Sequence, residues 1–196
     1  LLVVVIVFTA GLLKLREPAP ASSNLRIALI QPSVPQTLIW DPSGNAVRFQ
    51  QLLALTRDAL NNQADLLVWP ESALPELNDE NYTAITNLIR THHVWMIFNA
   101  DHVVMRRGAT DPNDYDVYNA AYLFDPAGRL VNIYDKQDLV MFGEYIPLAH
   151  WLPFLKWLSP IGDGFAAGDK PATFSLNLAS ETSSSPGYET IQVSGN

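Results

Sequence analysis

The sequence predicts an α/β fold, in which parallel strands alternate with amphipathic helices. Two apolar segments of strand length, residues 25–31 and 66–69, flank residues 47–62, whose apolar side chains recur at helical spacing. Strand, helix and strand in this order form a βαβ unit, which has parallel strands and a right-handed crossover. The 196 residues, of which 48% are hydrophobic and 16% charged, are enough for one domain with a sizeable core.

The second of these strands ends at a proline that is followed by a carboxylate. Residues 66–69 are apolar at every position, which suits a strand buried on both faces of a sheet. Pro70 ends the strand because proline has no N–H to donate to a neighbouring strand. Glu71 is a candidate general base, because ligands of open α/β folds bind at the carboxyl ends of the strands. From this stretch alone, a solvated loop glutamate is an equally good interpretation.

The middle of the chain repeats the pattern and then changes to a hairpin. Residues 81–92 have helical spacing and residues 94–99 form a further apolar strand, which makes a second βα repeat. Residues 101–116 are polar and turn-rich. Strands at 118–124 and 130–134 flank an Asp-Pro-Ala-Gly turn and therefore predict a hairpin.

The last third of the sequence contains shorter segments. Residues 172–178 and 188–193 are candidate strands, and they are separated by a Ser-rich loop. Residues 151–158 are aromatic and apolar, and they form either a lid or membrane-facing arm, or an ordinary buried segment.

Two further charged residues follow the predicted hairpin. The strand leads into Tyr134-Asp135-Lys136, and Glu144 lies eight positions later in an apolar loop that contains glycine. A lysine that leaves a strand into such a loop could be held inside the protein. The alternatives are a solvated ion pair of Lys136 with Asp135, and a surface position for Glu144.

The first residues of the sequence differ in composition from the rest. Residues 1–13 are almost wholly apolar, do not begin with methionine, and are followed by Lys14 and Arg16. We expect residues 1–16 to be the end of a transmembrane helix whose start lies outside this sequence, with both bases at the headgroup level. A buried core helix is the alternative. The Pro/Ala/Ser-rich residues 17–24 then form a linker to a separate domain at residues 25–196.

Charge and composition argue against several functions. A formal charge of −8, from 12 basic and 20 acidic residues, and the absence of a basic stripe argue against binding to nucleic acid. The sequence has no cysteine, which excludes disulfides and thiolate metal sites. Its four histidines have no zinc-type spacing, so neither a metal site nor a cofactor is expected.

Three motifs in order resemble one family. They are Val-Trp-Pro-Glu at 68–71, Tyr-Asp-Lys at 134–136 and Phe-Gly-Glu-Tyr-Ile-Pro at 142–147. Together they resemble the carbon-nitrogen hydrolase (nitrilase) superfamily, and most closely its membrane-bound branch, the apolipoprotein N-acyltransferases. The resemblance extends over residues 25–168, and the opening stretch at 27–36 followed by Trp40 also fits it.

The resemblance implies a fold and a catalytic apparatus. The fold would be a nitrilase-like α-β-β-α sandwich, incomplete at its C-terminus. In a Glu-Lys-Cys triad, Glu71 would be the general base and Lys136 would stabilise the oxyanion, while Glu144 would orient Lys136 or relay protons. The residues that the resemblance assigns to substrate binding are Trp40, Asn119 and Tyr145.

The resemblance also implies substrates and a location. A phospholipid acyl chain would pass through a cysteine thioester to the N-terminal amine of a diacylglyceryl-modified lipoprotein. The enzyme would reside in the bacterial inner membrane, with its catalytic domain on the periplasmic side. Two alternatives stay open: a soluble amidase or nitrilase, and a catalytically inactive binding domain.

The nucleophilic cysteine of the family is absent from this sequence. The one partial match is Gly187-Tyr188-Glu189, which has glycine in the place of cysteine. Either the sequence stops before the cysteine strand, or glycine has replaced the cysteine and the domain is inactive. We favour the first, because residues 182–186 are a Ser-rich loop and not the apolar strand that should precede the nucleophile.

Overall fold

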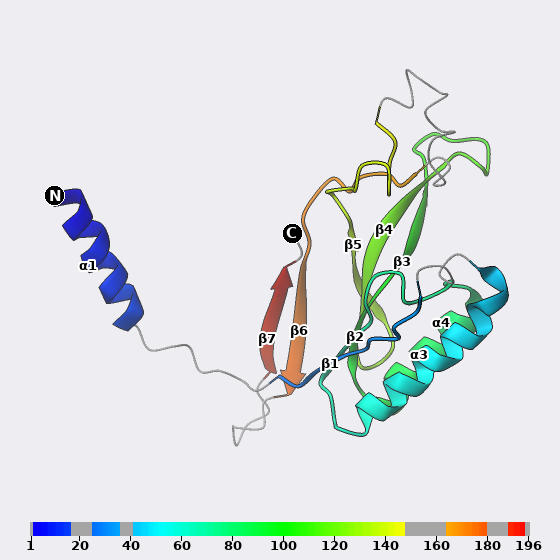
Figure 1. Cartoon of the computed structure of the whole chain (residues 1–196), viewed down its shortest axis with the longest axis horizontal. Helices are drawn as coiled ribbons and strands as arrows, with labels where there is room; N and C mark the ends of the chain where they lie inside the picture. The colour runs from blue at the N-terminus through cyan, green and yellow to red at the C-terminus, as the bar shows by residue number, and fades with distance from the viewer. Residues whose placement is uncertain (1, 17–24, 36–40, 148–163, 180–187, 195–196) are drawn as a thin grey trace.

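The described part of the chain contains a five-stranded sheet, a two-stranded sheet and helices. The computed structural model describes residues 2–16, 25–35, 41–147, 164–179 and 188–194. The larger sheet has the strand order β1-β2-β3-β4-β5, and β6 pairs with β7 in the smaller one (Figure 1).

Several predicted features lie outside the described residues. These are the substrate-binding assignment of Trp40, the linker at 17–24, the aromatic segment at 151–158, and the Ser-rich loop at 182–186 with Gly187 after it.

The large sheet is parallel on one side and antiparallel on the other. β1 pairs in parallel with β2, and β2 with β3, which confirms both predicted strand–helix–strand repeats. β4 is antiparallel to β3 and β5, so the predicted hairpin is also confirmed. The strands are β1 (Ile27–Leu29), β2 (Leu66–Val68), β3 (Trp95–Met105), β4 (Tyr115–Phe124) and β5 (Leu130–Asp135).

Two helices cover one face of this sheet. They are α3 (Asn45–Leu60), which follows the short 3-10 helix η1 (Pro42–Gly44), and α4 (Asp79–His92). Asn78 is the N-cap of α4, and its side chain accepts a hydrogen bond from the N–H of Asn81. The buried side chains of both helices join one core with the sheet, including Leu52, Ile89 and Phe98, none of which is exposed. Burying a side chain of this size contributes about 1.5 to 3 kcal/mol.

The opposite face of the sheet packs against β6 (Thr173–Ala179), which pairs with β7 (Tyr188–Ser194). Leu66 and Trp95 meet Phe174 and Leu176 of β6 in a second core. β2 is therefore buried on both faces, as its apolar sequence predicts. The described residues thus form a helix layer and two sheets, which are three of the four layers expected; no second helix layer is seen among them.

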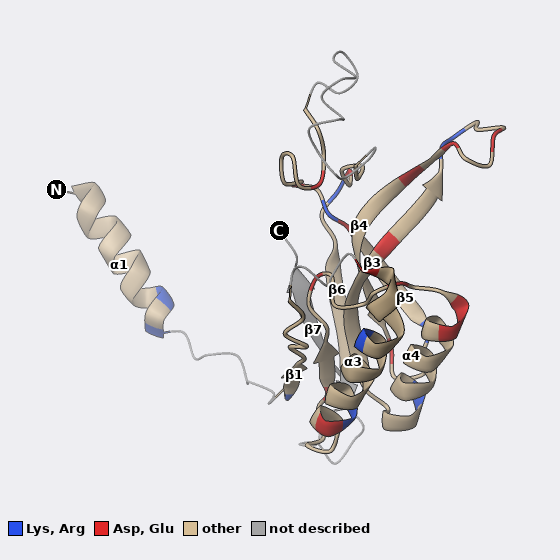
Figure 2. Cartoon of the chain, turned by 45° about the vertical axis from the view of Figure 1, so that its right-hand side comes forward, with Lys and Arg blue, Asp and Glu red and all other residues tan. Residues whose placement is uncertain are grey.

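The prediction for residues 101–116 is wrong at both ends. β3 continues to Met105 and β4 starts at Tyr115, and these two residues are paired in register. Cross-strand pairing sustains the strands here in spite of their polar residues. Only the tip is a turn, and there Arg106 forms ion pairs with Asp114 and Asp116. Figure 2 shows both basic (blue) and acidic (red) segments of the chain at this end of β3 and β4.

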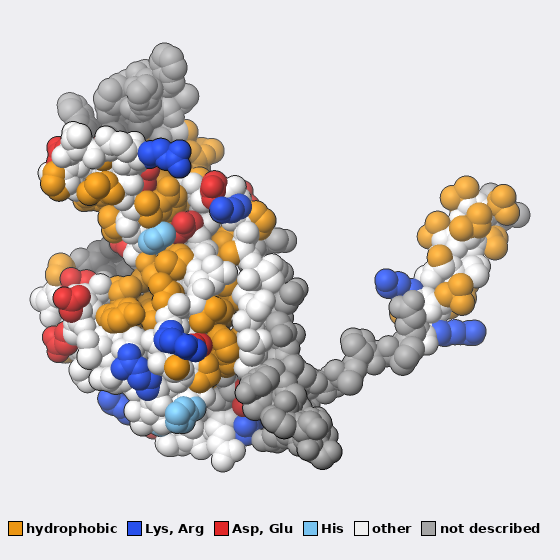
Figure 3. Space-filling model, turned by 180° about the vertical axis from the view of Figure 1, so that it is seen from behind, with side chains coloured by type: hydrophobic (Ala, Val, Ile, Leu, Met, Phe, Trp, Pro, Cys, Tyr) orange, Lys and Arg blue, Asp and Glu red, His pale blue; other side chains and the backbone are white. Residues whose placement is uncertain are grey.

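α1 (Leu2–Arg16) is a helix, as expected, and none of its residues is buried. Its apolar side chains are exposed over most of its length, and Lys14 and Arg16 lie at its end (Figure 3). α1 has 15 residues, and no helix in the described part of the chain is both long and apolar enough to cross a membrane. The transmembrane assignment of residues 1–16 therefore stays a prediction.

Candidate active site

The end of β2 positions Glu71. The N–H of Trp69 donates to the carbonyl of Ile97 at 2.9 Å, and Pro70 then ends the strand. Ser72 has φ of +59°, a conformation that costs energy for a residue with a side chain, and its N–H donates to Asn99 Oδ1 at 3.1 Å. The turn between strand and loop is thus held from β3, with the Glu71 side chain 56% exposed.

The end of β5 positions Lys136. Its N–H donates to the carbonyl of Asn119 on β4, and its carbonyl accepts from the N–H of Gly168, both at 2.9 Å. A Cβ at Gly168 would lie 2.2 Å from the carbonyl oxygen of Asp135. Only glycine allows this close approach of backbone to backbone, so residues 164–168 clamp the strand end from which the lysine projects.

Glu144 is held in a tight turn. Its N–H donates to the carbonyl of Val140, while the N–H of Val140 donates to Glu144 Oε2, each at 2.8 Å. The carbonyl of Glu144 accepts from the N–H of Phe165 at 2.7 Å. Glu144 is buried, and its carboxylate is fixed both by its own turn and by the residues it meets next.

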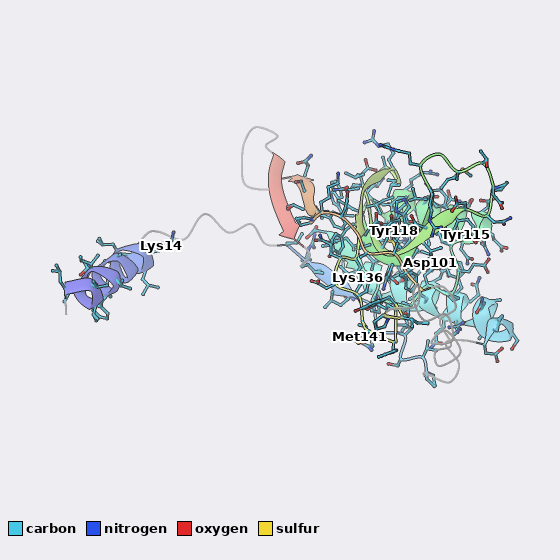
Figure 4. All side chains as sticks on the ribbon, turned by 90° about the horizontal axis from the view of Figure 1, so that it is seen from above. Lys14, Asp101, Tyr115, Tyr118, Lys136 and Met141 are labelled. Carbon is cyan, nitrogen blue, oxygen red and sulfur yellow. The ribbon has the colours of Figure 1, made fainter. Side chains whose placement is uncertain are left out.

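The three charged side chains meet on one side of the sheet. Lys136 Nζ lies 2.8 Å from Glu144 Oε1 and 3.5 Å from Glu71 Oε1. The prediction that Glu71 and Lys136 converge, with the lysine against a glutamate, is confirmed. Lys136 lies in the body of the domain in Figure 4, whereas Met141, on the loop between Lys136 and Glu144, is exposed.

Asn119 on β4 joins the two carboxylates. Its Nδ2 donates to Glu71 Oε1 at 2.6 Å and to Glu144 Oε1 at 2.9 Å. The sequence assigned Asn119 to substrate binding, but both of its donors are occupied by these glutamates. Tyr145 follows Glu144 and is half-buried, and it does not line the pocket described below. Substrate-binding roles for Asn119 and Tyr145 stay predictions.

Burial and the neighbouring charges have opposite effects on the pKa values of Lys136 and Glu144. Burial disfavours the charge of Lys136, but its hydrogen bond to Glu144 and the charge of Glu71 outweigh this and raise the pKa of the lysine. Burial likewise opposes the charge of Glu144, yet hydrogen bonds from Lys136, the Val140 N–H and Asn119 lower the pKa of its carboxyl. Both groups are therefore charged at neutral pH.

The charged side chains border a pocket of about 280 Å³. Its polar lining comes from Glu71, Lys136, Asn99 and Asn119, and its other walls are mostly apolar or aromatic. Glu144 does not line the pocket and reaches it through Lys136 and Asn119. The described site offers a carboxylate and an ammonium group to a reactant, with apolar surface beside them. The pocket is lined by Trp69, Glu71, Ile97, Phe98, Asn99, Asn119, Ala120, Ala121, Tyr134 and Lys136.

The sequence analysis missed Asn99. It lies in β3, next to the middle strand of the parallel part of the sheet, and lines the pocket beside Glu71. The argument that singled out Glu71 applies to it as well, since it is a polar residue at the end of the predicted apolar strand 94–99.

Comparison with known proteins places this chain in a family. The model of the carbon-nitrogen hydrolase family matches residues 26–179. An apolipoprotein N-acyltransferase of Brucella suis biovar 1 (strain 1330) is 32% identical over 160 residues, which cover 78% of this chain and 30% of that protein. One from Geobacter metallireducens is 34% identical over 174 residues, covering 83% and 31%.

The chain spans about a third of the length of these relatives. Among solved structures, an amidase from Nesterenkonia sp. is similar with a TM-score of 0.48 and 18% identity, over 80% of this chain and 53% of that one.

Proposed function

The chain belongs to the carbon-nitrogen hydrolase family, and we propose that Glu71, Lys136 and Glu144 form the acid–base part of an N-acyltransferase active site. The observation that carries the proposal is the position of Lys136 Nζ between two carboxylates, 2.8 Å from one and 3.5 Å from the other. The names of the relatives suggest an apolipoprotein as the acyl acceptor. The acyl donor that we propose is a phospholipid.

Glu71 is the general base in this proposal. Oε1 of Glu71 is engaged by Asn119 and Lys136, while Oε2 has no hydrogen bond to any residue in the described part of the chain. Oε2 takes the proton of a cysteine thiol, and the thiolate attacks the carbonyl carbon of the acyl ester. When the carbon–oxygen bond to the lysophospholipid breaks, Glu71 returns the proton to the leaving oxygen and a thioester remains.

Lys136 stabilises the oxyanion of each tetrahedral intermediate with its fixed positive charge. Glu144 is buried behind it and holds the ammonium group in place through the 2.8 Å contact. In the second half of the reaction, the amine of the lipoprotein attacks the thioester carbonyl and loses a proton to Glu71. As the carbon–sulfur bond breaks, Glu71 passes this proton to the leaving thiolate, which yields an amide and a free thiol.

The sequence contains no cysteine, so these 196 residues do not include the nucleophile. We propose that the thiol is supplied from chain outside this sequence. α1, with its exposed apolar side chains and its two terminal bases, is proposed as part of a membrane helix, with the domain on the periplasmic side of the bacterial inner membrane.

An exchange protein tests the proposal. Residues 26–179 would replace the matching segment of the Brucella suis relative, which would supply the cysteine and the rest of the protein. The purified protein is incubated with phospholipid, and the acyl-enzyme is measured by mass spectrometry. We expect an acyl-enzyme to form, and we expect Glu71→Gln to prevent it because glutamine cannot accept the thiol proton.

Glu76→Gln is the matched control, because Glu76 is exposed and lies only five residues further along the chain. It should acylate like the exchange protein itself. A folded exchange protein that forms no acyl-enzyme would contradict the proposal and favour the inactive binding domain. Acylation of Glu71→Gln at the unchanged rate would remove Glu71 from the role of base.

A further inference from the structure

Asn99 has all of its side-chain hydrogen-bonding groups engaged. Its Oδ1 accepts from the N–H of Ser72 at 3.1 Å. Its Nδ2 donates to the carbonyl of Ala120 at 3.0 Å and to Oδ1 of Asn119. A side-chain amide has two donor hydrogens and a carbonyl oxygen, so this set of partners uses both of its ends.

Two of these partners are backbone groups, and they fix the direction in which the amide of Asn99 points. The Ser72 N–H can only donate and the Ala120 carbonyl can only accept, so exchanging the oxygen and nitrogen of Asn99 would break both hydrogen bonds. Each backbone group belongs to a turn or strand that cannot rotate independently. The orientation of Asn99 is therefore set by the fold and not by the charged groups of the site.

The orientation of the Asn99 amide determines the orientation of the Asn119 amide. Asn99 and Asn119 lie diagonally across β3 and β4, because Asp101 pairs with Asn119 and Asn99 pairs with Ala121. The NH2 group of Asn99 faces Asn119, so Asn119 must present its oxygen to Asn99. Its own NH2 group is then left to face Glu71 and Glu144, to which it donates at 2.6 Å and 2.9 Å.

We propose that Asn99 is a positioning residue that keeps the NH2 group of Asn119 directed at both carboxylates. With the opposite orientation, the oxygen of Asn119 would face two carboxylate oxygens and its NH2 group would face that of Asn99. The cluster of Glu71, Lys136 and Glu144 contains two carboxylates and one ammonium group, so it has one uncompensated negative charge. The NH2 group of Asn119 supplies the remaining donors, and charge-assisted hydrogen bonds of this kind are the stronger ones.

The inference concerns hydrogen bonds in the chain as it stands, and it does not depend on acyl transfer. Its failure would leave Glu71 and Lys136 available as base and oxyanion partner. Conversely, an inactive domain could still contain the relay, that is, the hydrogen bonds that lead from Asn99 through Asn119 to the two carboxylates. The proposed acyltransferase function and the proposed role of Asn99 can therefore be contradicted independently of each other.

Nuclear magnetic resonance of the 196-residue chain tests the relay. The side-chain NH2 signals of Asn119 and the carboxyl carbon of Glu144 are followed as the pH is lowered. In the unsubstituted chain we expect both protons of the Asn119 NH2 group to shift as the carboxylates take up protons. If neither proton responds, the inference is overturned without any substitution.

Asn99→Asp and Asn99→Leu then break the relay in two ways. The carboxylate introduced by Asn99→Asp can only accept, so it should draw the NH2 group of Asn119 toward itself and away from Glu144. Asn99→Leu keeps a similar volume and offers no polar partner. In both variants the Asn119 signals should no longer follow the carboxyl of Glu144, whose titration midpoint should rise by about one pH unit.

Asn87→Asp is the matched control for Asn99→Asp. Asn87 is exposed on α4, which packs on the other face of the sheet, so the same substitution there adds the same charge away from the relay. It should leave the Asn119 signals and the Glu144 midpoint unchanged. If the Asn99 variants only lower the melting temperature and the Asn119 signals still follow Glu144, Asn99 has a structural role alone and the inference is wrong.

Discussion

Two clusters of opposite charges in this molecule have similar geometry and different surroundings. At the candidate active site, Lys136 lies 2.8 Å from Glu144, and their side chains are 28% and 11% exposed. At the tip of the β3–β4 hairpin, Arg106 lies 2.9 Å from Asp114, but these side chains are 56% and 43% exposed. Distance alone therefore does not distinguish the two pairs.

The difference lies in what each carboxylate would lose without its partner. Water can solvate Asp114 if Arg106 is removed, and exposed ion pairs contribute little to stability. Glu144 has little access to water and depends on Lys136, Asn119 and the Val140 N–H. Breaking a buried pair on one side leaves a charge without compensation, which costs far more than an exposed pair contributes.

The largest effect is expected from Gly168→Ala, which disturbs the site without removing a charge. The new Cβ would lie 2.2 Å from the carbonyl oxygen of Asp135, so the backbone beside Lys136 must move. We expect a loss of about 3 kcal/mol in the free energy of unfolding, measured by chemical denaturation. Gly44→Ala is the control, since its Cβ would meet nothing nearer than 3.9 Å, and it should cost less than about 1 kcal/mol. Equal losses would show that no close approach constrains Gly168.

Lys136→Met removes the shared positive charge and keeps most of the side-chain volume. Two carboxylates then face each other with Asn119 as the remaining donor that they share, so we expect a loss of about 2 kcal/mol in the free energy of unfolding. Lys170→Met is the matched control, because Lys170 is exposed, and denaturation should find its stability unchanged. If both variants unfold alike, Lys136 is no more important to the fold than a surface lysine.

Acid should weaken the ion pair of Lys136 and Glu144. The pKa of Glu144 is lower in the folded chain than its ordinary value of 4.5, so its contribution to stability is present above that value. It is lost as the pH falls through the lower, folded pKa. Denaturation curves should therefore show that the unsubstituted chain is more stable than Glu144→Gln at neutral pH, and that the difference in the free energy of unfolding narrows in acid below pH 4.5. A gap that does not change with pH would mean that the charge of Glu144 contributes nothing.

The raised pKa of Lys136 sets the upper end of the pH range in which the ion pair of Lys136 and Glu144 contributes to stability. A lysine whose folded pKa is above its ordinary value of 10.5 contributes stability that is present below that value. This contribution is lost as the pH rises through the folded pKa.

Arg106→Gln should have the smallest effect. Asp114 and Asp116 are left without their partner, but water can solvate them at the hairpin tip. We expect an unchanged melting temperature, both at low salt and at high salt. A clear drop at low salt that disappears at high salt would show that the tip pairs contribute after all, and the contrast with the site would be weaker.

Sequence reasoning was most successful where the cause was local. An apolar run that stops at Pro70 identifies the end of β2, and the parallel strands of a βαβ unit place Glu71 at its carboxyl edge. Lys136 was predicted to follow the hairpin for the same kind of reason. Their convergence over 65 positions in the sequence required only that both strands end at one side of the sheet.

The parts that failed depend on pairing between distant residues. The register of β3 and β4, which sets Asn99 diagonally to Asn119, cannot be derived from a polar stretch such as residues 101–116. The approach of Gly168 to Asp135 depends on a segment that crosses the strand end more than thirty positions later in the sequence. Side-chain relays and backbone contacts of this kind appear only once the strands are placed in space.

We have proposed that Lys136, held between two carboxylates, stabilises an oxyanion. The most direct test is the rate of acyl-enzyme formation in the exchange protein, measured by mass spectrometry for Lys136→Met and for Lys170→Met. We expect the rate to be lower by a factor of about 10² to 10³ for Lys136→Met and unchanged for Lys170→Met. Equal rates for the two variants, in proteins that thermal melts show to be folded, would contradict it.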